Sequence, residues 1–413
     1  MLTTHFKCPW TVEKYCSLIS GSYLADFIAW LESQGYRRIT IERLVQGVGN
    51  FARWAKTQGL TIEKFDRIAL AKLHCYLAKR KTLRYPSGDY NCVYRSARIF
   101  VSFLEARGVV GLDVHYPTQP VPILLQEFNE WMRTQRGTLD STLANYRLPI
   151  TKLLQNLGAD PKAFTAKDLR EFLLQELKEI SPGKTKNLTK ALRMFLRFLI
   201  ARGDCAVGLE HAIPTVARWH LSALPKYLPA NDVECLIKSC DQAQPLGARD
   251  RSMLLLIARL GLRAGEVRAL KFGDIDWSEG TLMVAGKNRR QSRLPLPQEV
   301  GESILHYLKH ARPNVVSEHI FITTLAPFGP IPRQVVGSAV VRALRRTGVS
   351  APSQGSHLLR HSMATSMLHD GISLHAIGAL LRHASIDTTT VYAKVDFALL
   401  AEVAMPWPEV QSC

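Results

Sequence analysis

The second half of the chain contains side chains that could together break a phosphodiester bond. The set is made of two arginines, a lysine, two histidines and a tyrosine: Arg263, Lys287, His357, Arg360, His383 and Tyr392. Guanidinium groups bind phosphate oxygens in bidentate fashion, and an ammonium group is well suited to protonate a departing oxygen. A tyrosine hydroxyl has an ordinary pKa of about 10, so it attacks phosphorus only when a base or cations assist it. Such cation clamps replace the metal ions of many phosphoryl-transfer enzymes, so we expect neither metal nor cofactor.

Arg263 follows an apolar stretch that predicts a buried helix. The stretch Met253–Leu260 is interrupted at Gly261. Glu266 stands three residues after Arg263, one helical turn away on the same face, and is the best candidate to orient it. Taken alone, this arginine is either a surface residue or a charge held in a pocket.

His357 and Arg360 lie at the start of a second predicted helix, for which Gly355-Ser356 supplies an N-cap candidate. Their spacing of three places them on one face, in the first turn, where the helix dipole favours an anionic phosphate. A rival interpretation is zinc binding, because His357 and His361 have the i, i+4 spacing of metalloprotease helices. That motif requires a glutamate after the first histidine, and the residue here is Leu358.

Tyr392 follows one more predicted helix. Gly371 is expected to end the preceding helix, and Ser373 is a plausible N-cap for the next one. His383 precedes Tyr392 by nine residues. A lone tyrosine is far more often a packed aromatic than a nucleophile, so the weight of the interpretation lies in the whole set.

Between the two arginine segments the sequence predicts a β-hairpin. Thr281–Ala285 is apolar and β-prone, a turn begins at Gly286, and the chain returns over Ser292–Pro297. Lys287 stands at the start of this turn. More basic residues surround it: Arg289, Arg290 and Arg293. A basic hairpin tip can enter a DNA groove, and a solvated basic turn is the alternative.

The order and spacing of these residues resemble the catalytic set of the tyrosine recombinases, the phage integrase family. The resemblance covers most of residues 226–396 and rests on four stretches: Gly261-Leu-Arg-Ala-Gly-Glu266, Gly286-Lys287, His357-Leu-Leu-Arg-His-Ser-Met-Ala-Thr365 and Leu380-Leu-Arg-His383. It implies that Tyr392 attacks DNA and leaves a 3′-phosphotyrosine and a free 5′-hydroxyl. Lys287 would be the acid, and His357 would help to deprotonate the tyrosine. Double-stranded DNA target sites and a homo-tetramer assembled on two of them are the implied partners.

Two features depart from the family pattern. Arg382 precedes His383 where many members have glycine, and it could add a phosphate contact or merely tighten a turn. The N-terminal half holds two helical units where the simplest members have one, so the extra unit resembles an arm-type or additional core-binding segment.

The N-terminal half carries an internal repeat. Phe100–Gly108 matches Phe195–Gly203 at six of nine positions, and Phe27–Trp30 has a counterpart in Phe128–Trp131. The offsets of 95 and 101 indicate duplicated helical units with altered loops, although amphipathic helices can match by chance. Three prolines in Pro117–Pro122 mark a boundary. We therefore predict a mostly α multidomain protein with two helical units, SAM-like by the family resemblance, at 1–117 and 118–222, and an α+β catalytic domain with a small β-hairpin or sheet at 226–413.

Charge favours a polyanionic partner. The chain has 53 Lys and Arg against 35 Asp and Glu, a formal charge of +18, and each neutralised phosphate releases counterions. The helical units contain basic residues suited to phosphate contacts: Arg80, Lys81, Arg84, Arg95, Lys184 and Lys186. A solvated helix face is the alternative for each of them.

The eight cysteines are scattered, and no pair has the C-x-x-C spacing of a zinc site, which favours free thiols in a reducing compartment. The sequence shows no apolar run long enough for a bilayer and no signal-peptide core near Met1. We expect a cytoplasmic, nucleoid-associated protein without membrane contact.

Several functions remain open. The leading one is a site-specific recombinase that integrates or transposes a mobile element. The same chemistry could resolve chromosome or plasmid multimers, or relax supercoils in the manner of a type IB topoisomerase, although the helical repeat favours site-specific binding. A non-catalytic DNA-binding protein is disfavoured by the complete residue set. The apolar tail after Asp396 would pack either on a neighbouring protomer or on its own domain.

Overall fold

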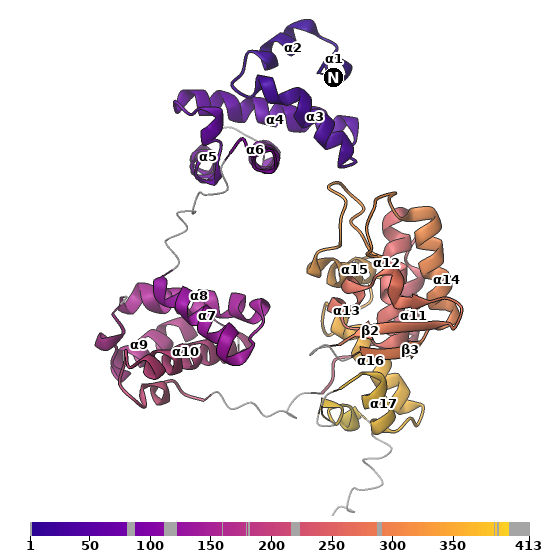
Figure 1. Ribbon diagram of the computed structural model, residues 1–413. Helices are drawn as coiled ribbons and strands as arrows, with labels where there is room; N and C mark the ends of the chain where they lie inside the picture. Colours follow the sequence, from indigo (N-terminus) through magenta and orange to yellow (C-terminus); the bar gives the residue numbers. More distant parts are fainter. Residues whose placement is uncertain are drawn as a thin grey trace, which may run out of the picture. The chain divides into compact units, whose positions relative to one another are not determined.

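The computed structural model describes residues 2–80, 87–110, 122–158, 160–178, 180, 182–215, 224–286, 291–383, 385 and 388–395 (Figure 1). The chain divides into two compact units: Met1–Ile28 with Glu42–Trp219, and Ala29–Ile41 with His220–Cys413. The mostly helical fold with one small sheet confirms the predicted fold class. Within the described residues, no helix is both long and apolar enough to cross a membrane.

The N-terminal half is helical throughout its described length. Its elements are α1 (Leu2–His5), α2 (Pro9–Cys16), α3 (Gly21–Ser33), α4 (Arg38–Thr57), the 3-10 helix η1 (Ile62–Lys64), α5 (Arg67–Arg80), α6 (Ser87–Ala106), α7 (Ile123–Arg136), α8 (Asp140–Leu157), the 3-10 helix η2 (Pro161–Ala163), α9 (Ala166–Leu177), α10 (Pro182–Arg202) and the 3-10 helix η3 (Leu209–Ala212). The order α3, α4, η1, α5, α6 recurs as α7, α8, η2, α9, α10. Each copy is thus two helices, a 3-10 turn and two more helices.

The repeat extends to the packing of the aromatic core. In the first copy Phe27 meets Phe100 edge to face, with ring centroids 5.0 Å apart and planes at 81°. In the second copy the equivalent rings of Phe128 and Phe195 are 5.6 Å apart at 86°. All four rings are fully buried. Edge-to-face pairs depend on specific geometry, so chance similarity of two amphipathic helices does not explain this agreement.

A surface arginine is also placed equivalently in both copies. The guanidinium of Arg107 lies 5.2 Å from the ring of Phe103, and that of Arg202 lies 5.2 Å from the ring of Phe198. Each arginine also pairs with an acid just before the first phenylalanine of its copy: Arg107 with Asp26, and Arg202 with Glu127. The duplication read from the sequence is therefore present in the structure. The predicted domain limits at 117 and 222 fall outside the described residues and stay predictions.

The C-terminal unit contains a small sheet among helices. Its elements from residue 224 on are α11 (Ala230–Lys238), α12 (Pro245–Leu260), α13 (Ala264–Ala269), the 3-10 helix η4 (Phe272–Asp274), β1 (Ile275–Asp276), β2 (Thr281–Ala285), β3 (Gln291–Pro295), α14 (Gln298–His306), the π-helical turn η6 (Tyr307–Ala311), α15 (Arg333–Thr347), α16 (Ser356–His369), α17 (Leu374–Leu380) and the 3-10 helix η8 (Tyr392–Val395). The sheet is antiparallel in the order β1-β2-β3, with Leu282 opposite Leu294. The predicted hairpin is confirmed. Strand β1 has two residues, which is too short for an alternation of apolar and polar side chains to indicate a strand in the sequence.

Helix α12 is the centre of this unit, and α11, α14, α15 and α16 pack around it (Figure 1). Residues Met253–Ile257 are buried on every side of the helix. This explains why this stretch shows no alternation of apolar and polar residues at helical spacing. The helix ends at Gly261 in a left-handed conformation, with φ 58°. A Cβ atom there would lie 2.6 Å from the Leu381 side chain, so any other residue at this left-handed position would be strained and would displace Leu381.

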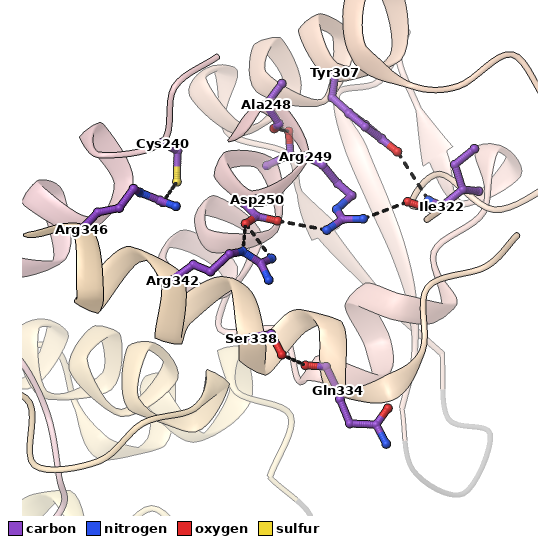
Figure 2. A network of polar contacts seen from close by, with 11 residues as sticks. Cys240, Ala248, Arg249, Asp250, Tyr307, Ile322, Gln334, Ser338, Arg342 and Arg346 are labelled. Carbon is purple, nitrogen blue, oxygen red and sulfur yellow. Dashed lines mark hydrogen bonds and ion pairs between the residues drawn. The ribbon is translucent and has the colours of Figure 1, made fainter. Parts of the chain in front are cut away.

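A buried ion-pair network ties α12 to α15 (Figure 2). Asp250 is fully buried and pairs with Arg249 at 3.3 Å and with Arg342 of α15 at 2.7 Å. Arg249 also donates a hydrogen bond to the carbonyl oxygen of Ile322 at 3.2 Å. Asp250 therefore compensates two cations, one of which is itself buried.

We expect Asp250→Ala to destabilise the protein by about 3–5 kcal/mol, because it leaves the buried Arg249 guanidinium without a counter-charge. Urea unfolding measures this loss. Arg345→Ala on the exposed face of α15 is the matched control and should change stability by less than about 0.5 kcal/mol. Equal unfolding midpoints for the two variants would contradict the assignment.

Candidate active site

Arg263 is held in place by the carboxylate of Glu266. Arg263 is the N-cap residue of α13, and its backbone N–H donates to Glu266 Oε2 at 2.8 Å. Its Nη1 donates to Glu266 Oε1, also at 2.8 Å. Burial acts to raise the pKa of Glu266, but the Arg263 backbone hydrogen bond and the charges of Arg382 and Arg263 more than offset this and lower it. Glu266 is therefore an ionised clamp that fixes the direction of the Arg263 guanidinium.

Arg382 shares this carboxylate. Its Nη2 lies 2.8 Å from Glu266 Oε2, and its carbonyl oxygen accepts a hydrogen bond from Arg263 Nη2 at 3.4 Å. Its backbone is left-handed, with φ 55°, directly after the end of α17. This is the conformation that glycine adopts without strain, which explains why glycine suits the position. Of the two roles expected for Arg382, the tightened turn is present, and its side chain turns back onto Glu266.

Arg360 joins three separate segments of the chain. It is 4% exposed and donates hydrogen bonds to the carbonyl oxygens of Gly261 and Leu381. Burial, with the neighbouring positive charges of Arg263 and Arg382, lowers its pKa to about 10, so it stays protonated at neutral pH. The ends of α12 and α17 are thereby fixed to the N-terminal part of α16.

The two predicted catalytic histidines lie within electrostatic reach of both arginines. Partial desolvation of the ring and then the charges of Arg360 and Arg263 lower the pKa of His357, although solvent still reaches this side chain on α16. The same causes in the same order lower the pKa of His383 to about 4. His383 Nδ1 lies 2.7 Å from Oγ1 of the buried Thr389. Its Nε2 is therefore the nitrogen left for a ligand, and both rings are neutral hydrogen-bonding groups.

Tyr392 is buried at the edge of this cluster. It is 1% exposed and packs in a small apolar core with Leu368, Ile377 and Leu381. Burial raises its pKa to about 12, against the opposing charge of Arg360. Its hydroxyl oxygen lies 2.8 Å from Nδ1 of His361.

The sequence did not predict the roles that three residues have in this arrangement. The sequence suggested His361 only as a disfavoured metal ligand, but its ring faces the tyrosine. Its signal is the spacing of four from His357, which places it one turn further along α16. Thr389 has no signal beyond lying near Tyr392. The contact of Arg382 with Glu266 spans 116 residues and cannot be read from spacing.

The basic hairpin and the helical units are only partly described. Several predicted residues lie outside the described residues: Lys287, Arg289, Arg290, Lys81 and Arg84. So does the tail from Asp396, and the side chain of Arg80 in α5 is not described either. Arg95, Lys184 and Lys186 are exposed on α6 and α10. Arg293 on β3 donates to Thr281 Oγ1 at 2.9 Å and lies 3.8 Å from a carboxylate oxygen of Asp276.

The depressed histidine pKa values predict acid lability. His361 and His383 have pKa values of about 4 in the folded protein, against an ordinary 6.5. Below pH 6.5 the unfolded chain binds protons that the folded chain does not, so stability present above pH 6.5 is lost as the pH falls toward 4. After allowance for solvent screening, we expect a loss of about 2 kcal/mol for the pair. Urea unfolding at pH 7.5 and 4.5 measures it, and His361→Asn should lose less than the wild type. An unchanged pH dependence in that variant would contradict the assignment.

Comparison with known proteins gives one consistent family. The phage integrase family matches residues 226–398. A protein described as an integrase/recombinase, y4rA of Sinorhizobium fredii, is 34% identical over 393 residues, covering 94% of this chain and 94% of its own. Tyrosine recombinase XerC of Lactobacillus delbrueckii subsp. bulgaricus is 28% identical over 285 residues, covering 66% of this chain and 94% of its own. In fold, the chain is similar to the XerH site-specific recombinase bound to its palindromic difH substrate, with a TM-score of 0.55 and 19% identity over 81% of this chain and 94% of that one.

Proposed function

Because this chain belongs to the phage integrase family of tyrosine recombinases, we propose that it cuts and rejoins DNA through a 3′-phosphotyrosyl bond to Tyr392. The observation that carries the proposal is that Arg263 and Arg360 both donate hydrogen bonds to the backbone of residues 381–382, directly before His383, and that the charge of Arg360 reaches Tyr392. Residues more than 100 positions apart are joined there by direct hydrogen bonds. Cations gathered beside a tyrosine hydroxyl support phosphoryl transfer to that tyrosine.

In the proposed reaction the scissile phosphate lies between the two guanidinium groups. Arg263 is oriented by Glu266, so its remaining N–H groups are fixed for the non-bridging oxygens. His357 and His383, both neutral, add hydrogen bonds to the same phosphate. Lys287 protonates the departing 5′ oxygen. The phosphotyrosyl diester conserves the energy of the broken bond, so the 5′-hydroxyl of a partner strand can rejoin without an external energy source.

The buried tyrosine fits a protein that does not cleave before DNA is bound. With its hydroxyl on His361 and its ring in an apolar core, Tyr392 has little contact with solvent. A pKa of about 12 keeps the phenol protonated. The tyrosine can therefore attack only after the substrate phosphate has bound between Arg263 and Arg360.

The duplicated helical units support recognition of an extended DNA site. Each copy carries exposed basic residues: Arg95 on α6, and Lys184 and Lys186 on α10. We infer that both copies bind duplex DNA and that four protomers assemble on two sites. The specific role we favour is integration or transposition of a mobile element. Multimer resolution by the same chemistry is the second candidate, because XerC is among the relatives.

The test uses two duplexes that carry the ends of the element on which the gene resides. Wild-type protein should yield strands exchanged between the duplexes. It should not relax supercoiled plasmids that lack those ends. Efficient relaxation of any plasmid without strand exchange would instead support a topoisomerase-like activity and contradict this proposal.

A further inference from the structure

His361 contacts the nucleophile directly. Its Nδ1 lies 2.8 Å from the Tyr392 hydroxyl oxygen, with ring centroids 5.6 Å apart and planes inclined at 55°. The two side chains come from α16 and η8, which pack against each other. A hydrogen bond of this length fixes the direction of the hydroxyl group, and with it the lone pair that would attack phosphorus.

Among the described contacts, neither of the other two histidines of the site meets the tyrosine hydroxyl. His383 Nδ1 is occupied by Thr389. The ring of His357 lies 6.2 Å from that of His361 and is on the exposed side of α16. Across the part of the chain that the structure describes, His361 is the imidazole found in hydrogen-bond contact with the tyrosine hydroxyl. The geometry thus places His361 at the nucleophile and leaves His357 and His383 for the phosphate.

We propose that His361 orients the Tyr392 hydroxyl and accepts its proton as the bond to phosphorus forms. The inference rests on the proposed function, since it concerns the same attack. As the Oη–P bond forms, the phenolic O–H bond breaks and its proton moves to Nδ1. The P–O bond to the 5′ oxygen breaks, and that oxygen takes a proton from Lys287. In the rejoining step the imidazolium returns its proton to the tyrosine. The ring must carry its resting hydrogen on Nε2.

Burial keeps both groups neutral before attack. Burial, followed by the charges of His357 and Arg360, lowers the pKa of His361 to about 4, so the ring is neutral and the Nδ1 lone pair is available. The pKa of about 12 for Tyr392 means that the phenol keeps its proton in the free protein. The proton therefore moves only when bonding to phosphorus makes the phenol acidic, which couples deprotonation to attack.

The test compares His361→Phe and His361→Asn in single-turnover cleavage of a nicked duplex carrying an element end. We expect His361→Phe to form the covalent complex at least tenfold more slowly, with unchanged DNA affinity in gel-shift titrations. His361→Asn keeps a polar group near the hydroxyl, so it should be intermediate, and it carries the test if the phenylalanine variant does not fold. His369→Asn is the matched control, because His369 is on the same helix but contacts the Val395 carbonyl. It should retain the wild-type rate.

A second substrate separates this role from leaving-group protonation. Replacing the bridging 5′ oxygen by sulfur gives a thiolate that departs without a proton. This duplex should restore cleavage by Lys287→Ala but not by His361→Phe. Wild-type cleavage by His361→Phe, or its rescue by sulfur, would overturn the inference. A wild-type protein that forms no covalent complex on any element end would overturn the proposed function instead.

Discussion

Tyr392→Phe abolishes formation of the covalent protein–DNA complex while leaving the fold and DNA binding intact. The substitution removes the single oxygen that is to form the bond to phosphorus. The phenylalanine ring occupies the same apolar core of Leu368, Ile377 and Leu381, so packing is retained. Loss of the hydrogen bond to His361 should lower stability by only about 1 kcal/mol. Denaturing gels of protein incubated with nicked element ends measure the covalent product.

Tyr307→Phe is the matched control for this variant. Tyr307 is the other fully buried tyrosine of the C-terminal unit, and its hydroxyl accepts a hydrogen bond from the Ile322 backbone. Tyr307→Phe should cost similar stability and still form the covalent complex. Covalent product at wild-type yield from Tyr392→Phe would show that a different residue is the nucleophile.

Arg263→Ala lowers the first-order cleavage rate by about 10²–10³, the effect of removing one preorganised donor from a developing oxyanion. The variant should fold, because the Arg263 side chain is 33% exposed and Glu266 keeps its ion pair with Arg382. Arg263→Lys should recover little of the rate, since an ammonium group lacks the planar fork that Glu266 holds in place. Rates from single-turnover quench experiments give the comparison.

Arg268→Ala provides a matched loss of positive charge on the same helix. Arg268 donates to the carbonyl oxygen of Ile331 and does not take part in the contacts with Glu266. It should cleave within a few-fold of the wild type. If Arg263→Ala and Arg268→Ala lost activity equally, general charge on α13 rather than a fixed contact with phosphate would explain the effect.

Local signals in the sequence were sufficient for the elements that position the site. The spacing of apolar residues and the turn residues predicted three elements that are present in the structure. These are the hairpin of Thr281–Ala285 with its return strand, the end of a buried helix at Gly261, and the N-cap at Ser373. The internal repeat was visible in a stretch of nine residues. In the structure the two copies also share the edge-to-face packing of their buried phenylalanine rings. These features depend on neighbours within a few positions, which is why a single sequence reveals them.

The contacts that complete the site depend on tertiary structure and could not be predicted. Nothing local indicates that Glu266 holds two arginines, or that Thr389 fixes His383. No catalytic role was predicted for His361, because helical spacing alone shows which residues share a face, not what lies opposite that face. Its partner Tyr392 is 31 residues away.

Mass spectrometry of trapped protein identifies the residue that carries the DNA. Wild-type protein is trapped on a nicked element end, digested with protease and nuclease, and the nucleotide-modified peptide is sequenced by mass spectrometry. We expect a nucleotide 3′-phosphate on the hydroxyl of Tyr392, within the peptide that follows His383. A nucleotide on any other side chain, or a cleaved product with no protein attached, would contradict it.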